Sequence, residues 1–163
     1  MIDDDGTIIH FYPWDADTMA LDNLPCMGGE QAREQVYDWL LSDRGFEPGG
    51  DPDLPHWLRR RGVVCEVSEG LRTELVSDLY GFAPKTSIFF RLEKGDTHLA
   101  GWDAVRSTVL AAIDRFACDV VLFGPDDGTM LAARDGELRL ARGAWGPRDL
   151  DAMDRPYVLT ALE

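Results

Sequence analysis

The segment Thr86-Ser87-Ile88-Phe89-Phe90-Arg91-Leu92 decides the fold, because its composition and alternation are those of a β-strand. The turn Gly95-Asp96-Thr97 follows it, and then an amphipathic helix that we expect to end near Ala117. The large apolar residues of this helix are Trp102, Val105, Val109, Ile113 and Phe116. Their spacings of three and four residues indicate a helix that lies on a sheet.

Beyond this helix the sequence predicts a short strand and a hairpin. Residues 119–123 are an apolar run closed by a Gly-Pro-Asp-Asp-Gly turn. The strands Thr129 to Ala133 and Glu137 to Arg142 flank Asp135-Gly136, a dipeptide typical of tight hairpin turns. Residues 82–142 are therefore expected to form one β-α-β-β core unit.

The first half of the chain is less regular. We expect a strand over Thr7 to Tyr12, which Pro13 ends, and a loop over Trp14 to Met27. A helix with Ala32, Val36, Trp39 and Leu40 on one face is expected from about Glu30 to Asp43. Residues 45–57 are rich in glycine and proline, which predicts a surface loop.

Three further elements complete the prediction: a strand over Gly62 to Val67, a short helix over Leu71 to Tyr80, and a last edge strand over Tyr157 to Leu162. An edge strand near Tyr157 would allow dimerisation by strand pairing. The order of elements predicts an α+β fold, in which two main helices pack on one face of a mostly antiparallel sheet. A length of 163 residues fits a single domain, residues 1–163.

The charge of the chain is strongly acidic and unevenly distributed. Thirty acidic and sixteen basic residues give a net charge of −14 at pH 7. Residues 1–60 hold thirteen acids and four bases, a net of −9, and residues 61–163 hold seventeen and twelve, a net of −5. An acidic surface disfavours nucleic acid and anionic membranes, and it favours solubility or a basic partner.

The sequence has no signal for membrane insertion or secretion. No apolar run approaches the roughly 20 residues that span a bilayer, and the acidic start Met1-Ile2-Asp3-Asp4-Asp5 differs from a secretory signal. We therefore expect a cytoplasmic protein.

Motifs that carry chemistry are absent from the sequence. The cysteines Cys26, Cys65 and Cys118 are odd in number and widely spaced, which argues against a disulfide framework or a CxxC metal pair. Neither a nucleotide-binding glycine loop nor a GxSxG elbow is present. No metal and no cofactor are expected.

One enzymatic alternative remains open at this point. Cys26 lies just before Gly28-Gly29 and a predicted helix N-terminus, where the helix dipole could lower the thiol pKa. With His10 or His56 as the base, this arrangement would be a Cys-His hydrolase.

Candidate binding residues lie in the acidic loops of the first half. Tryptophans among acids resemble interface anchors, although they can equally cover the rim of a core. The candidates are Trp14, Asp15, Asp17, Asp22, Asp51, Asp53 and Trp57.

The second half of the chain resembles a known family. Leu79-Tyr80-Gly81-Phe82 and the strand Ser87 to Lys94 resemble a stretch in the immunity proteins of bacterial swarming-inhibition (Sit-type) toxin–immunity pairs. The family's next strand and hairpin are matched by Asp119 to Phe123 and Met130 to Leu140, and Pro156-Tyr157-Val158 is similar too. The resemblance covers about half the chain.

This resemblance implies a cytoplasmic, non-enzymatic protein that binds and neutralises a cognate toxin. The acidity of the chain suggests a toxin with a basic surface, contacted by the loops Trp14 to Asp22 and Glu47 to Trp57. The immunity protein itself would be a monomer or a homodimer. A generic adaptor domain with a peptide or small-molecule pocket is the alternative binding function.

Overall fold

A computed structural model describes residues 18–22, 29–50, 52–53, 57–69, 86–116, 120–124, 128–134 and 136–162. Its strands are β1 (Thr18–Asp22), β2 (Glu47–Pro48), β3 (Trp57–Arg60), β4 (Val63–Glu69), β5 (Thr86–Leu92), β6 (Val120–Phe123), β7 (Thr129–Arg134), β8 (Glu137–Ala141) and β9 (Val158–Thr160). Its helices are α1 (Gly29–Asp43), α3 (His98–Phe116) and α4 (Pro147–Asp151).

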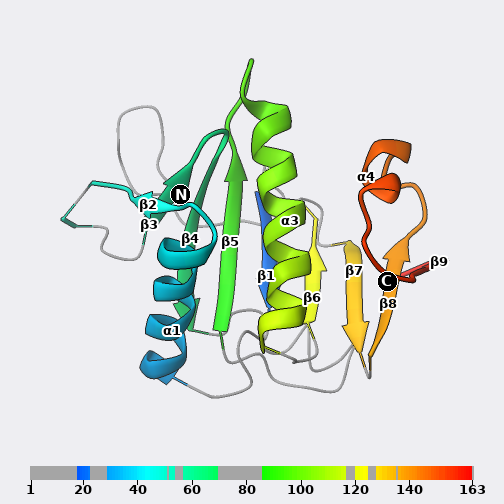
Figure 1. The fold of residues 1–163 in the computed structure, drawn as a ribbon, viewed down its shortest axis with the longest axis horizontal. Coiled ribbons are helices and arrows are strands. Elements are labelled where there is room, and N and C mark those ends of the chain that lie inside the picture. The colour runs from blue at the N-terminus through cyan, green and yellow to red at the C-terminus, as the bar shows by residue number, and fades with distance from the viewer. Residues whose placement is uncertain are drawn as a thin grey trace.

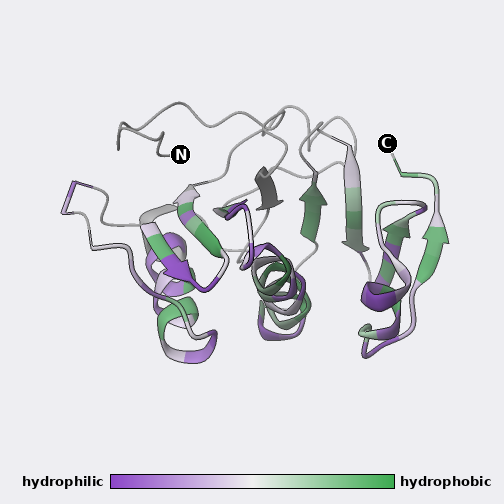
Figure 2. Cartoon of the chain, turned by 90° about the horizontal axis from the view of Figure 1, so that it is seen from above, coloured by the Kyte–Doolittle hydropathy of each residue, from purple (hydrophilic) through white to green (hydrophobic). Residues whose placement is uncertain are grey.

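The nine described strands form one sheet in the order β2-β3-β4-β5-β1-β6-β7-β8-β9. All neighbouring strands are antiparallel except β8 and β9, which are parallel. Helices α1 and α3 lie side by side on one face of the sheet (Figure 1), and the view from above places both on the same side (Figure 2). The predicted α+β fold, with two main helices on one face of a mostly antiparallel sheet, is confirmed.

One row of directly paired residues crosses most of the sheet: Val67, Ile88, Leu21, Leu122, Leu131, Leu140 and Leu159. Val67, Ile88, Leu122, Leu131 and Leu140 are at most 1% exposed and belong to the same core cluster as residues of α1 and α3. The row therefore follows the face of the sheet that the helices cover. It ends in β9 at Leu159, which is 39% exposed.

The predicted loop from Trp14 to Met27 is wrong at its centre, because β1 lies there. This strand is antiparallel to both β5 and β6, so β5 and β6 are parallel to each other with β1 between them. The sequence Thr-Met-Ala-Leu-Asp carries little strand propensity of its own, since alanine and aspartate are depleted in strands. Its conformation depends on hydrogen bonds to two strands that come much later in the chain.

The predicted loop over residues 45–57 also needs correction. Its exposed residues Glu47 and Pro48 form β2, and Trp57 begins β3, which the sequence analysis did not predict. Both strands are short and contain Pro or Arg residues, so neither shows a period of two. The predicted strand at Thr7 to Tyr12 and the helix at Leu71 to Tyr80 lie outside the described residues.

In the second half the predicted elements are present, with small shifts at their ends. Strand β5 has the predicted bounds, and α3 ends at Phe116. Strand β9 occupies the centre of the expected edge strand and is the last strand at one end of the sheet. The predicted β-α-β-β unit differs in one respect: β5 and β6 are not neighbours, because β1 separates them.

The buried face of α3 is centred on small residues. Ala104, Thr108 and Ala112 are at most 2% exposed, while Trp102 and Phe116 are only partly buried beside them. Of the predicted apolar residues, Val105 and Val109 share this buried face and are at most 1% exposed, whereas Trp102, Ile113 and Phe116 are only partly buried. Small residues allow the helix to approach the sheet closely, and the packing of α3 depends on that approach.

The closest approach joins Gly101 of α3 to Gly62 in the turn between β3 and β4. A β-carbon added at Gly101 would lie 1.9 Å from the carbonyl oxygen of Gly62. A β-carbon at Gly62 would lie 2.2 Å from the carbonyl oxygen of Thr97, and Gly62 has a φ of +84°, which favours glycine. Gly62 also accepts a hydrogen bond of 2.8 Å from the backbone N–H of Glu93.

The substitution Gly101→Ala tests this contact. An alanine inside a helix normally stabilises by about 1 kcal/mol relative to glycine, but here the new methyl group meets backbone that cannot move aside. We expect a loss of about 2 kcal/mol in the free energy of unfolding, measured by urea denaturation. The variant Ala100→Gly in the same helical turn measures how much the difference in helix propensity between alanine and glycine changes the free energy of unfolding. A Gly101→Ala protein that gains stability would contradict the tight contact.

Candidate interaction surface

Of the binding residues predicted from the sequence, the structure describes Asp22, Asp53 and Trp57. The other four lie outside the described residues: Trp14, Asp15, Asp17 and Asp51. Asp22 ends β1, where it pairs with Ser87 and Val121. Asp53 is exposed between β2 and β3. Asp22 thus lies in a central strand and Asp53 in a connection near one edge of the sheet, and the described residues do not join them into one site.

Trp57 has a structural environment of its own. It is 6% exposed and pairs with Glu66 across β3 and β4. Of the two roles considered for the loop tryptophans, this burial fits the covering of the core. Trp145 is likewise 6% exposed, and its indole N–H donates a hydrogen bond of 2.8 Å to the carbonyl oxygen of Met130.

Groups that could carry catalysis are sparse in the described residues. Cys65 is fully buried in β4, and this burial raises the pKa of its thiol, which keeps the sulfur protonated and unreactive. Among the described residues no three His, Cys, Asp or Glu side chains come close enough to hold a metal ion. Cys26, His10 and His56 lie outside these residues, so the Cys-His hydrolase stays a hypothesis.

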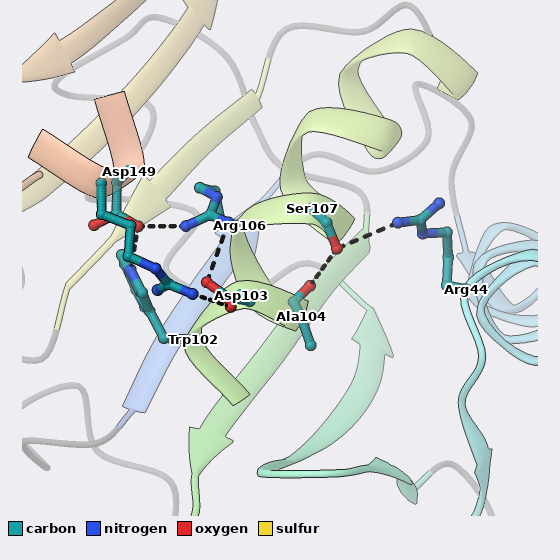
Figure 3. A network of polar contacts seen from close by, with 8 residues as sticks. Arg44, Trp102, Asp103, Ala104, Arg106, Ser107 and Asp149 are labelled. Atoms are coloured by element: carbon teal, nitrogen blue, oxygen red, sulfur yellow. Dashed lines mark hydrogen bonds and ion pairs between the residues drawn. The ribbon is translucent and has the colours of Figure 1, made fainter. Parts of the chain in front are cut away.

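A buried polar network joins α3 to α4 (Figure 3). Asp149 of α4 accepts a hydrogen bond of 2.7 Å from the indole N–H of Trp102 and forms an ion pair of 2.5 Å with Arg106. The side chains of Arg106 and Asp149 are each only 12% exposed. A pair so shielded from water is costly to break, because the remaining partner would be a buried, uncompensated charge.

The network continues to the surface of α3 through Asp103. Its carboxylate binds Arg106 at 3.1 Å and Arg148 of α4 at 2.5 Å. The hydrogen bond from Arg148 and the charge of Arg106 hold the pKa of Asp103 below its ordinary value. In the sequence, Asp103 and Arg106 fall outside the apolar residues of α3 that recur every three or four positions. Only the position of α4 converts them into a docking site.

A second polar contact ties the segment after α4 to the same helix. Arg155 donates two hydrogen bonds, of 2.8 and 2.9 Å, to the two carboxylate oxygens of Asp114, and it pairs with Asp154 at 2.8 Å. This bidentate geometry is the strong form of an arginine–carboxylate contact. It fixes the chain just before β9.

A surface pocket of about 300 Å³ opens between the end of α1, the middle of α3 and the segment after α4. Its lining comprises Arg44, Arg106, Ser107, Leu110, Ala111, Asp114, Ala152, Asp154 and Arg155. Arg106, Asp114, Asp154 and Arg155 are already engaged in ion pairs, and Arg44 donates to the hydroxyl of Ser107 at 3.3 Å. The pocket therefore has little polar capacity left for a ligand.

Exposed apolar side chains gather at one edge of the sheet. Among the described residues the large exposed hydrophobics are Leu99 at 56%, Tyr157 at 36%, Val158 at 47% and Leu159 at 39%. Three of the four lie in or beside β9, at the end of the sheet (Figure 1). This edge is the strongest apolar surface feature in the part of the chain that the structure describes.

Comparison with known proteins assigns the family. The sequence model of the SitI3-like family matches residues 27–149, which is more than half of the chain. The chain belongs to the SitI3-like family. The matched range runs from just before α1 into α4 and includes the α3 network. Searches of curated proteins and of solved structures returned no match.

Membership of the SitI3-like family supports the resemblance to Sit-type immunity proteins and suggests a non-enzymatic role. No helix in the described part of the chain is long and apolar enough to cross a membrane. Helices α1 and α3 and the Arg106–Asp149 pair lie within the matched range, whereas Arg155 and the apolar edge at β9 lie beyond it.

The substitution Asp149→Asn tests the buried pair of this SitI3-like core. Because Arg106 would lose its charged partner inside the protein, we expect a loss of about 3–5 kcal/mol in the free energy of unfolding. Asp154→Asn is the matched control, since the Asp154 side chain is 66% exposed; its loss should stay within about 1 kcal/mol. Equal losses in the two variants would show that the Arg106–Asp149 pair contributes no more than a surface contact.

The Asp103 contacts predict a dependence of stability on pH. Folding lowers the pKa of the Asp103 carboxylate. The ionised carboxylate therefore stabilises the folded protein in full above the ordinary carboxylate pKa of about 3.9. This stabilisation is lost as pH falls through the lower pKa of the folded state. The stability difference between the wild type and Asp103→Asn should therefore shrink as pH falls from 6 to 3. Thermal unfolding followed by circular dichroism measures it, and a constant difference would contradict the assignment.

Proposed function

We propose that this protein is the immunity partner of a Sit-type toxin, and that it neutralises the toxin by binding it in the cytoplasm without catalysis. Membership of the SitI3-like family over residues 27–149 is the observation that carries the proposal. Cys65, the cysteine that the structure describes, is fully buried and offers no nucleophile at the surface.

The charge of the chain supports a basic toxin as the partner. A net charge of −14 attracts a cationic surface over the Debye length, about 8 Å at physiological ionic strength. Such attraction speeds the encounter more than it deepens the affinity. Neutralisation would benefit from a fast encounter, because the toxin has to be bound before it reaches its target.

The acidic loops of the first half are the proposed contact surface. The candidate contacts are Trp14, Asp15, Asp17, Asp22, Asp51 and Asp53. Residues 1–60 carry a net charge of −9, and Asp53 is exposed beside β2. Trp57 would support this surface from below, because it is buried in β3.

Co-expression with the protein encoded by a toxin-like neighbouring gene tests the function. We expect the wild-type chain to protect cells from that protein and to co-purify with it. A neighbour that kills cells regardless of this chain, and that does not bind it, would overturn the proposal.

The location of the contact surface is tested by paired charge variants. The double variant Asp51→Asn/Asp53→Asn should lower the association rate about three- to tenfold at low salt, since it weakens electrostatic steering. Asp38→Asn/Asp96→Asn removes the same two charges from α1 and from the turn before α3, and should change the rate less. Stopped-flow association kinetics at two salt concentrations measure both. Equal effects of the two variants would rule out a local contact.

A further inference from the structure

Among the strands that the structure describes, β9 is the last at one end of the sheet, and its outer backbone edge pairs with none of the others. The carbonyl oxygen of Thr160 accepts a hydrogen bond of 3.0 Å from the N–H of Arg142, so the backbone groups of Thr160 point toward the chain that continues β8. Backbone groups alternate in direction along a strand. The N–H and C=O of Leu159 therefore point outward, past the last strand of the sheet.

The side chain of Leu159 makes this edge continuous with the core. Leu159 pairs with Leu140, and Leu140 pairs through Leu131 and Leu122 with the centre of the sheet. Leu140, Leu131 and Leu122 are fully buried, whereas Leu159 is 39% exposed. The apolar row thus ends on an exposed leucine, where a polar residue would normally face water.

The opposite edge of the sheet is protected. Strand β2 has only two residues, Glu47 and Pro48, which bring a charge and a residue without a backbone N–H. Short strands, charges and proline are the usual means by which proteins block edge pairing. Around β9 the sequence Pro156 to Leu162 carries no charge, and Figure 2 shows the strand in hydrophobic colours at the rim of the sheet.

We propose that an extended segment of the toxin pairs with β9 and continues the sheet. This inference rests on the proposed function. It adds a short-range contact to the long-range attraction that the acidic loops would provide. Backbone pairing at an edge gives affinity, and alternate side chains give specificity. The apolar row ending at Leu159 supplies a ready position for an apolar side chain of the added strand.

Charge favours the toxin over a second copy of this chain as the occupant. Two copies joined at β9 would bring together two molecules that each carry −14, and a seam of three residues per copy offers little area to offset this repulsion. A basic toxin is attracted by the same charge. The uncharged strip at β9 then contacts it without a desolvation cost for charged groups.

The test compares Leu159→Glu with Leu99→Glu in binding to the toxin from the neighbouring gene. Both variants replace an exposed leucine by the same charge, one at the edge and one on α3. We expect Leu159→Glu to raise the Kd about tenfold or more and Leu99→Glu to leave it within about twofold. Leu159→Lys should weaken binding as well, which separates strand pairing from attraction between charges.

The outcomes distinguish this inference from the proposed function. If the wild type binds the toxin and both Leu159 variants bind as tightly as Leu99→Glu, the edge contact is wrong and the immunity function stands. If the wild type does not bind the toxin, the proposed immunity function itself is wrong. Light scattering of the free protein at low and high salt should show a monomer. A dimer that Leu159→Glu separates would assign the edge to a second copy and overturn the proposal.

Discussion

The contact between the backbones of Gly62 and Gly101 sets the position of α3, and most of the described structure depends on that helix. Two glycines allow a helix and a strand turn to meet at a distance that any side chain would prevent. The small residues Ala104, Thr108 and Ala112 continue the close approach along the sheet. The position of α3 on the sheet therefore depends on the small size of these residues as much as on the burial of apolar side chains.

Helix α3 in turn organises the C-terminal part of the chain. Its buried Arg106 and its Trp102 bind Asp149 of α4, and Asp114 at its far end binds Arg155. These contacts hold the segment that leads into β9, so that this short strand can pair in parallel with β8 at the edge of the sheet. The charged groups of α3 connect this helix to the C-terminal segment through ion pairs within the protein.

The surface that remains for a partner is divided into two kinds of chemistry. In the proposed function, the acidic loops of the first half would provide long-range attraction, and the apolar edge at β9 would offer backbone groups and side chains for short-range contact. This division suits a protein that binds another protein quickly and specifically.

The sequence by itself determined the main helix and the strands of the second half of the chain, although not the order of those strands in the sheet. The alternation in Thr86–Leu92 and the period of α3 are local patterns, and each is strong enough to predict its element without knowledge of the rest. The family resemblance rests on the same segments. The net charge and the acidic first half also follow from the sequence alone, because charge does not depend on the fold.

Only the tertiary structure decided the remaining points, because they depend on residues far apart in the chain. Thr18–Asp22 is a strand since β5 and β6 enclose it, and Arg106 is a buried charge since α4 covers it. Leu159 is an apolar residue like many others in the sequence. It becomes the exposed end of a core row only when seven strands have been placed beside one another in register.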